Sequence, residues 1–243
     1  MNPIPLFSLT TLILAAVTAQ AAEPLQNIIV GLDTKRQAIT AVHRESGKIF
    51  QFTVKDAALF KSAKLCETFE APVAEMQKGK DFAADFGNAD PKKSCCTLTT
   101  DIGGAGRALG VRRYEQEGVD VILAEMKRTS GDTVTARWQY CNGGKQMVRF
   151  KEQGCVGMGC TYTLAEEVHF LDGATRTKHD VLRDTSNKAL AERYTSDKLA
   201  VAPNRLLATW AKFQAPPEST TNVTVVIPGV SEPFEDVPIA NGN

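Results

Sequence analysis

The residues best suited to chemistry in this sequence are sulfur-containing side chains in one short stretch. Cys155, Met158 and Cys160 lie close together, and Cys141 precedes them. Thiolate and thioether groups are soft ligands of the kind that bind Cu(I). In an oxidising compartment the same thiols pair as disulfides, and the glycines around Met158 would let a turn bring Cys155 and Cys160 together. A disulfide is the main interpretation, and a copper site formed by these four residues is the alternative.

All six cysteines of the chain are disulfide candidates: Cys66, Cys95, Cys96, Cys141, Cys155 and Cys160. An even number of cysteines favours pairing in an exported chain, although six cysteines allow fifteen pairings. The adjacent Cys95 and Cys96 could form a strained, redox-labile disulfide with each other. We expect each of them to pair elsewhere, because a strained bond costs several kcal/mol. No Cys-x-x-Cys occurs, which disfavours a thioredoxin-like oxidoreductase.

The histidines offer a weaker site. His169 and His179 would face each other across a predicted hairpin, with Glu166 and Glu167 nearby, and His43 lies far from them in the sequence. Zinc sites need more ligands at close spacing, so we expect these histidines to lie on strand surfaces. The sequence also lacks the Gly-x-Ser-x-Gly, His-Glu-x-x-His and Walker motifs. It therefore predicts no catalytic residue and no cofactor-binding residue.

The N-terminal segment predicts export. Residues 1–21 contain no charged side chain, Leu6 to Val17 is apolar, and Ala19-Gln20-Ala21 has the small-x-small pattern of a signal-peptidase site. The apolar run is too short for a bilayer, which needs about 20 residues of helix. We expect a signal peptide cleaved near Ala21 and a periplasmic or secreted protein that does not span the membrane. The chain has 28 basic and 28 acidic residues, and this balance argues against nucleic-acid binding.

The mature chain begins with short predicted strands over 28–30, 39–44 and 49–55. Asp56 can cap a short helix to Lys64, and strands over 66–73 and 79–86 follow. Short strands with one short helix predict a small OB-like barrel over 25–98.

The segment ITAVHRESGKIFQFTVKDAALFKSAKLCETFEA resembles part of small bacterial periplasmic OB-fold domains, distantly like the copper-binding proteins of copper and silver efflux systems. Those proteins bind Cu(I) through a His, a Trp and two Met. His43 stands near the right place, but no Trp or Met lies between His43 and Phe52. The resemblance therefore implies the fold and not the copper site.

A glycine-rich stretch, DIGGAGRALG, marks a linker over 99–112. Its glycines lie at Gly103, Gly104, Gly106 and Gly110. A dinucleotide-binding loop would need a buried parallel strand before these glycines and a helix after them, and the flanking sequence predicts neither.

Residues 113–240 predict a second all-β domain. Apolar and polar residues alternate from Gly118 to Phe150, with turns at 130–132 and 142–144, which predicts strands with one buried and one wet face. Further strands are expected over 167–171, 179–182, 206–213 and 222–227. This spacing predicts a β-sandwich, with Trp138 and Trp210 on apolar faces in its core.

Three runs in this part resemble an immunoglobulin-like sandwich domain of bacterial envelope proteins. They are RTSGDTVTARWQYCN, HFLDGATRTKHDVLRD and LLATWAKFQAPPESTTNVTVVIPGVSEPFEDVPIA. The resemblance covers roughly 119–240 and implies a fold and a compartment, because that domain has no established enzymatic activity.

The sequence thus predicts an exported, non-enzymatic binding or adaptor protein of the bacterial envelope. Its expected partner is another envelope protein, which would contact sheet edges or loops at the domain junction. The alternative is a periplasmic copper-binding protein using the Cys and Met ligands named above. A weaker third hypothesis is a thiol-redox protein using Cys95 and Cys96.

Overall fold

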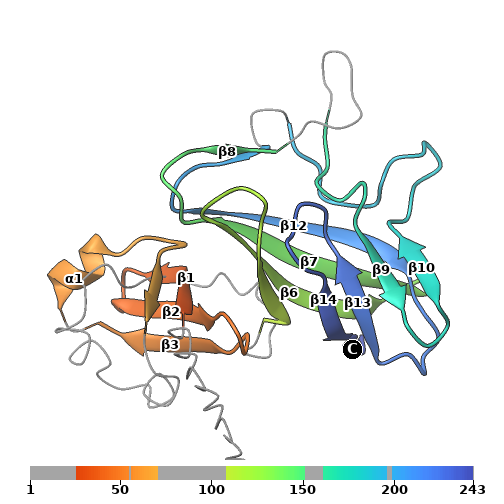
Figure 1. Cartoon of the computed structure of the whole chain (residues 1–243), viewed down its shortest axis with the longest axis horizontal. Helices are drawn as coiled ribbons and strands as arrows, with labels where there is room; N and C mark the ends of the chain where they lie inside the picture. The colour runs from red at the N-terminus through yellow and green to blue at the C-terminus, as the bar shows by residue number, and fades with distance from the viewer. Residues whose placement is uncertain (1–25, 55, 71–107, 151–160, 196–198, 243) are drawn as a thin grey trace, which may run out of the picture.

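The chain folds almost entirely into β-strands (Figure 1). The computed structural model describes residues 26–54, 56–70, 108–150, 161–195 and 199–242. Within these ranges the all-β prediction is confirmed, and the only helix is a short one near the N-terminus. No helix of the described residues is both long enough and apolar enough to cross a membrane.

The N-terminal part is a four-stranded antiparallel sheet with the order β3-β2-β1-β4. Its strands are β1 (Gln26–Asp33), β2 (Ala38–His43), β3 (Ile49–Thr53) and β4 (Thr68–Glu70). The helix α1 (Ala57–Ser62) begins after Asp56, whose Oδ1 accepts a hydrogen bond from Ala58 N at 2.8 Å. This is the predicted cap. Phe60 and Ala63 then pack with Ile29 and Phe50 in a small core.

The predicted OB-like barrel is not confirmed. In the described residues β3 and β4 are the two outer strands, and they do not pair with each other, so the sheet is open. A barrel needs a closed ring of tilted strands, which these four do not form. The strand expected over 79–86 lies outside the described residues.

The C-terminal part is a two-sheet sandwich. One sheet has the order β12-β7-β6-β5 and consists of β5 (Gly110–Arg113), β6 (Val119–Thr129), β7 (Thr133–Asn142) and β12 (Arg205–Gln214). The other has the order β10-β9-β13-β14 and consists of β9 (His169–Asp172), β10 (Thr177–Asp180), β13 (Asn222–Val226) and β14 (Phe234–Pro238). A short ribbon, β8 (Val148–Arg149) with β11 (Ala200–Val201), lies at one end.

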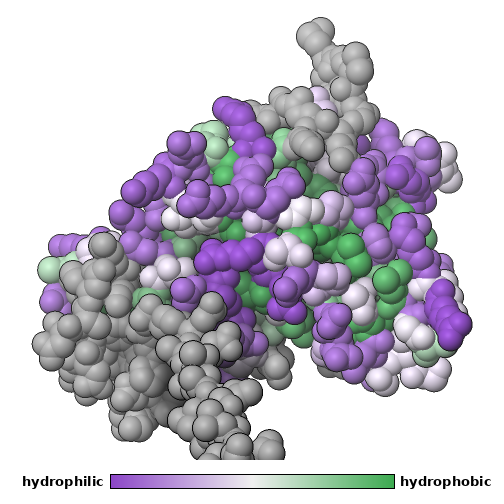
Figure 2. Space-filling view, viewed as in Figure 1, coloured by the Kyte–Doolittle hydropathy of each residue, from purple (hydrophilic) through white to green (hydrophobic). Residues whose placement is uncertain are grey.

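The two sheets enclose one apolar core. Leu123 and Trp138 from the first sheet meet Phe170, Val225 and Phe234 from the second. On the face shown in Figure 2, hydrophilic side chains surround the hydrophobic residues that remain visible. This arrangement is the expected one for a sandwich in which each strand sends alternate residues inward.

The sandwich begins earlier than the sequence suggested. Gly110 to Arg112, which the sequence placed in the linker, form the start of β5. Leu109 N donates to Leu123 O at 2.7 Å, and the buried Ala108 donates its N–H to Gly47 O of the N-terminal part at 2.8 Å. These residues belong to the sandwich sheet and to the contact between the two parts.

The prediction of one wet face for the strand over 119–124 is wrong. Asp120, Ile122 and Ala124 point away from the sandwich core, yet all three are buried. The reason is that the N-terminal sheet packs on this outer face, where Ile28, Val30 and Val42 meet Ile122 and Ala124.

The two tryptophans have different positions. Trp138 is 0% exposed in the sandwich core, as predicted. The prediction for Trp210 is wrong, because Trp210 is only partly buried and lies opposite Arg137 on the outer face. On β12 the residues that point inward are Thr209, Ala211 and Phe213, and strand alternation turns Trp210 outward.

Candidate functional site

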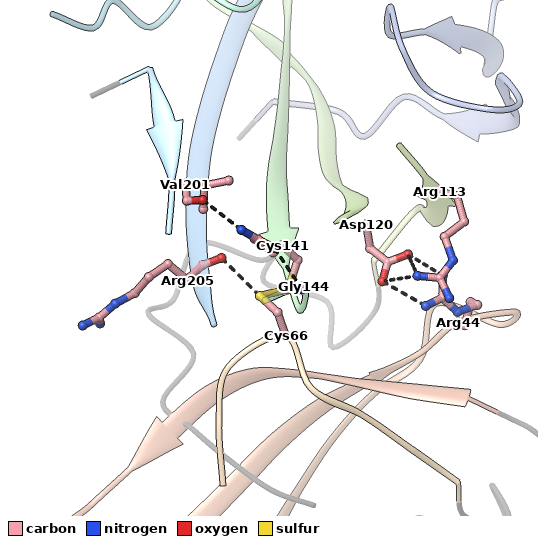
Figure 3. Close-up of a disulfide and its surroundings, with 9 residues drawn as sticks. Arg44, Cys66, Arg113, Asp120, Cys141, Gly144, Val201 and Arg205 are labelled. Carbon is pink, nitrogen blue, oxygen red and sulfur yellow. Dashed lines mark hydrogen bonds and ion pairs between the residues drawn. A yellow bond between two sulfur atoms is a disulfide. The ribbon is translucent and has the colours of Figure 1, made fainter. Parts of the chain in front are cut away.

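A disulfide joins the two parts of the molecule (Figure 3). Cys66 lies between α1 and β4, Cys141 lies on β7, and their Cα atoms are 5.3 Å apart. Both residues are buried, and Cys66 N donates to Ile29 O at 2.7 Å. The disulfide prediction is therefore confirmed for this pair, which joins the N-terminal sheet covalently to the sandwich.

This bond removes Cys141 from the alternative copper site, because a disulfide sulfur is no longer available as a thiolate ligand. The other residues of that hypothesis, Cys155, Met158 and Cys160, lie outside the described residues, as do Cys95 and Cys96.

A second link between the two parts is ionic. Arg44 follows β2 and forms a bidentate pair with Asp120 of β6, with Nη1–Oδ1 at 2.5 Å and Nη2–Oδ2 at 2.9 Å (Figure 3). The Asp120 side chain is 3% exposed and that of Arg44 is 19% exposed. Arg113 adds a longer contact, Nη1 to Oδ1 at 3.3 Å. The two-pronged geometry fixes orientation as well as distance, so the two parts hold one arrangement.

The turn after β7 completes the junction. Asn142 holds the turn, since its Oδ1 accepts from Gly144 N at 2.9 Å and its Nδ2 donates to Val201 O at 2.9 Å. Gly143 then lies against the N-terminal part, where a Cβ atom would be 2.2 Å from Cys66 O. The predicted turn at 142–144 is therefore also a contact surface that only glycine fits.

Gly143→Ala is expected to lower the free energy of unfolding by about 2 kcal/mol, the usual cost of forcing a methyl group into a packed site. The added Cβ meets a backbone carbonyl, which cannot rotate away as a side chain can. Urea unfolding of the oxidised mature protein measures the change. Gly173→Ala is the matched control, because nothing lies within 4 Å of a Cβ at Gly173. Equal stability of the two variants would contradict the close contact.

His43 ends β2 beside this junction. It is 3% exposed, and its Nδ1 accepts from Ser46 N at 3.2 Å. Burial lowers the pKa of the imidazole; Glu45 opposes the shift and Lys48 adds to it. The described residues provide no partner for the buried Nε2. The neutral ring is thus the form that this site favours.

We expect His43 to make the protein less stable in mild acid. Because the native pKa is lowered, the unfolded chain binds more protons, and stability is lost as the pH falls below the unfolded value of about 6.5. Urea unfolding at pH 7.5 and pH 5 should show a smaller difference for His43→Asn, whose amide oxygen can replace Nδ1 as an acceptor, than for the wild type. If the unfolding free energies of both proteins depend on pH in the same way, His43 does not cause the loss of stability in acid.

The expectation that His169 and His179 face each other across the hairpin is wrong. His179 pairs with Phe170 in the β9–β10 register while His169 pairs with Asp180, so the two imidazoles lie on opposite faces. His179 stacks on Phe170 with ring centroids 4.4 Å apart. Among the described residues, no three His, Cys, Asp or Glu side chains are close enough to bind a metal ion.

A concave surface lies on the same outer face that the N-terminal sheet partly covers. A bulge between Leu123 and Glu125 shifts the register of β6, and the concave surface begins beyond it. The outer-face groove, as we name it, has a volume of about 1750 Å³. Its floor comes from three strands and consists of Glu125, Lys127, Thr129, Thr133, Thr135, Arg137, Trp210 and Lys212. Its walls include Arg128, Asp132, Ala215, Pro216, Pro217, Glu218, Asn241 and Gly242.

The strand register arranges the floor in rows. Glu125, Arg137 and Trp210 form one row, and Lys127, Thr135 and Lys212 form the next. In the first row Arg137 Nε lies 3.5 Å from Glu125 Oε2, and Trp210 Nε1 donates to Glu192. In the second row, no ion pair forms within the described structure for either lysine.

Sequence reasoning missed this site. Its only signal was the alternation on β12, where Trp210 and Lys212 lie between the inward residues Thr209, Ala211 and Phe213.

Comparison of the chain with protein-family models, with curated proteins and with solved structures finds no match. The functional argument therefore depends on the geometry above.

Proposed function

We propose that this protein is an exported, non-enzymatic binding or adaptor protein of the bacterial cell envelope, and that the outer-face groove is its binding surface. The observation that carries this proposal is the groove itself: a concave polar floor built from three paired strands of one sheet. Sites on paired strands keep their side chains in place better than sites on loops, which favours recognition of a ligand without rearrangement.

The junction supports the same interpretation. The Cys66–Cys141 disulfide and the Arg44–Asp120 pair fix the N-terminal sheet against one half of the outer face, and the groove occupies the other half. A buried disulfide is typical of an oxidising compartment, in agreement with the signal peptide predicted for residues 1–21. The resemblance of residues 119–240 to an immunoglobulin-like envelope domain points to the same compartment.

The test uses the mature protein, residues 22–243, and the washed envelope fraction of the bacterium that produces it. We expect the protein to co-sediment with this fraction and the recovered ligand to be chemically unchanged. Thr135→Tyr, which places a bulky neutral ring at the centre of the floor, should reduce retention at least tenfold. Thr177→Tyr, at an exposed position of β10, is the matched control. Release of altered products, or equal retention of both variants, would contradict the proposal.

A further inference from the structure

We propose that the ligand of the outer-face groove is an acidic saccharide chain, whose carboxylates pair with Lys127 and Lys212 and whose ring stacks on Trp210. This inference depends on the proposed function and names the chemistry of its ligand. It has three supports: the charge of the floor, the position of the tryptophan, and the nature of the remaining lining.

The charge of the floor is positive. Lys127, Arg137 and Lys212 are its basic side chains, and Glu125 is its acidic one. Glu125 is already within 3.5 Å of Arg137, which leaves the two lysines as the floor charges that form no ion pair among the described residues. On the walls, Asp132 accepts from Gln214 Nε2 at 2.8 Å. Glu218 is the other wall carboxylate and Arg128 the wall guanidinium. The unpaired ammonium groups would attract a negatively charged ligand to the floor.

The two lysines are spaced for a chain with repeated charges. Both are half-buried, and both lie opposite Thr135, one on each neighbouring strand. Two strand spacings place their Cα atoms about 10 Å apart. An extended polyanion can give each ammonium group a carboxylate of its own.

Trp210 supplies an apolar surface next to these charges. It precedes Lys212 by two residues on β12, so both side chains lie on the same face. The hydrogen bond from its Nε1 to Glu192 fixes the plane of the ring. A partly exposed indole with its polar end already satisfied offers its flat face to an apolar ligand surface, such as the C–H face of a sugar ring.

The rest of the lining favours a saccharide over a peptide. The central strand β7 pairs with β6 and β12 on its two sides. Beside the groove, the outer edge of β6 bonds to Ala240 and the outer edge of β12 bonds to the segment 182–192. A peptide therefore finds no free edge there to which it could add as a strand. Apart from Trp210, apolar side chains occur only in the wall segment 215–217, too few to anchor alternate peptide side chains. Thr129, Thr133 and Thr135 instead place hydroxyl groups in the floor, where Thr129 Oγ1 lies 2.9 Å from Thr133 Oγ1 and 3.2 Å from Thr135 Oγ1. A hydroxyl oxygen has two lone pairs, so this cluster can still accept hydrogen bonds from the hydroxyls of a sugar.

Isothermal titration of the mature protein tests the proposal with four probes: oligogalacturonate, dextran of equal length, poly-glutamate and oligodeoxythymidylate. We expect binding of oligogalacturonate that weakens with salt, and at least tenfold weaker binding of the other three. Lys127→Gln with Lys212→Gln should lower the oligogalacturonate affinity at least tenfold and flatten its salt dependence. Trp210→Ala should lower it as well. The matched control is Lys145→Gln with Lys188→Gln, two exposed lysines outside the groove. Each variant should have the same thermal unfolding midpoint as the wild type.

Three results would overturn the inference. Equal affinity for dextran would show that the lysines take no part, and equal affinity for poly-glutamate or oligodeoxythymidylate would assign the groove to a different polyanion. Absence of binding to oligogalacturonate would overturn it outright. These failures differ from failure of the proposed function: if Thr135→Tyr abolishes retention on the envelope fraction while the lysine variant does not, the groove binds a ligand of another class.

Discussion

Replacement of Cys66 and Cys141 by alanine is expected to lower the free energy of unfolding of the oxidised protein by about 4 kcal/mol. The bond spans a sequence separation of 75 residues. In the chain-entropy description a loop of this size restricts the unfolded state by about 4 kcal/mol. Guanidinium unfolding of the wild type and the double variant under oxidising conditions measures the difference.

Reductant supplies the control for this experiment. Adding dithiothreitol should destabilise the wild type more than the Cys66→Ala, Cys141→Ala variant, because the variant has already lost this bond. If the double variant loses less than about 1 kcal/mol, the two cysteines are not joined in the oxidised protein, and the covalent part of the junction must be abandoned.

Asp120→Ala is expected to cost about 3 kcal/mol of unfolding free energy. The substitution leaves Arg44, whose side chain is only 19% exposed, without its bidentate partner. Removing one member of a buried ion pair is expensive because the remaining charge stays in a poorly solvated site. Thermal and urea unfolding of the oxidised protein give the change.

The matched control is Glu125→Ala, on the same strand β6 and the same face. Its partner Arg137 is 51% exposed, so the loss should stay below about 1 kcal/mol. Removing Arg44 and Asp120 together should cost less than the two single losses combined, since the pair then leaves as a unit. Additive losses would mean that the two side chains do not interact.

Local patterns predicted much of the fold. Alternation found β6 and β7, the turns at 130–132 and 142–144 follow from their glycine and asparagine, and Asp56 marked the start of α1. These features depend on neighbours in sequence, which periodicity and capping rules describe well. The open N-terminal sheet was not predicted, because strand content alone does not distinguish an open sheet from a closed one.

Local patterns did not predict what covers the outer face of the β12-β7-β6-β5 sheet. Ile122 and Ala124 stand at positions that alternation assigned to the wet face, and two apolar residues there indicate that something covers them. What covers them is a sheet from the other end of the chain, which no local pattern specifies. The same long-range dependence left Cys66–Cys141 as one of fifteen possible pairings.

The outer-face groove depends on register, which the sequence does not display. Its rows exist only because β6, β7 and β12 align Lys127, Thr135 and Lys212 side by side. The bulge between Leu123 and Glu125 decides which residues of β6 join the groove floor. A strand without the bulge would turn the later residues of β6 to the opposite face.

The disulfide also determines how the molecule would respond to mechanical load. When a pulling force is applied at the two ends, tension passes from Cys66 directly to Cys141 through the sulfur atoms. The chain between them, which contains β4, β5, β6 and most of β7, bears no tension while the bond is intact. With a sequence separation of 75 residues, about 260 Å of contour length stays locked. Part of the wall and part of the floor of the groove thus belong to the portion of the chain that a pulling force cannot extend until the disulfide breaks.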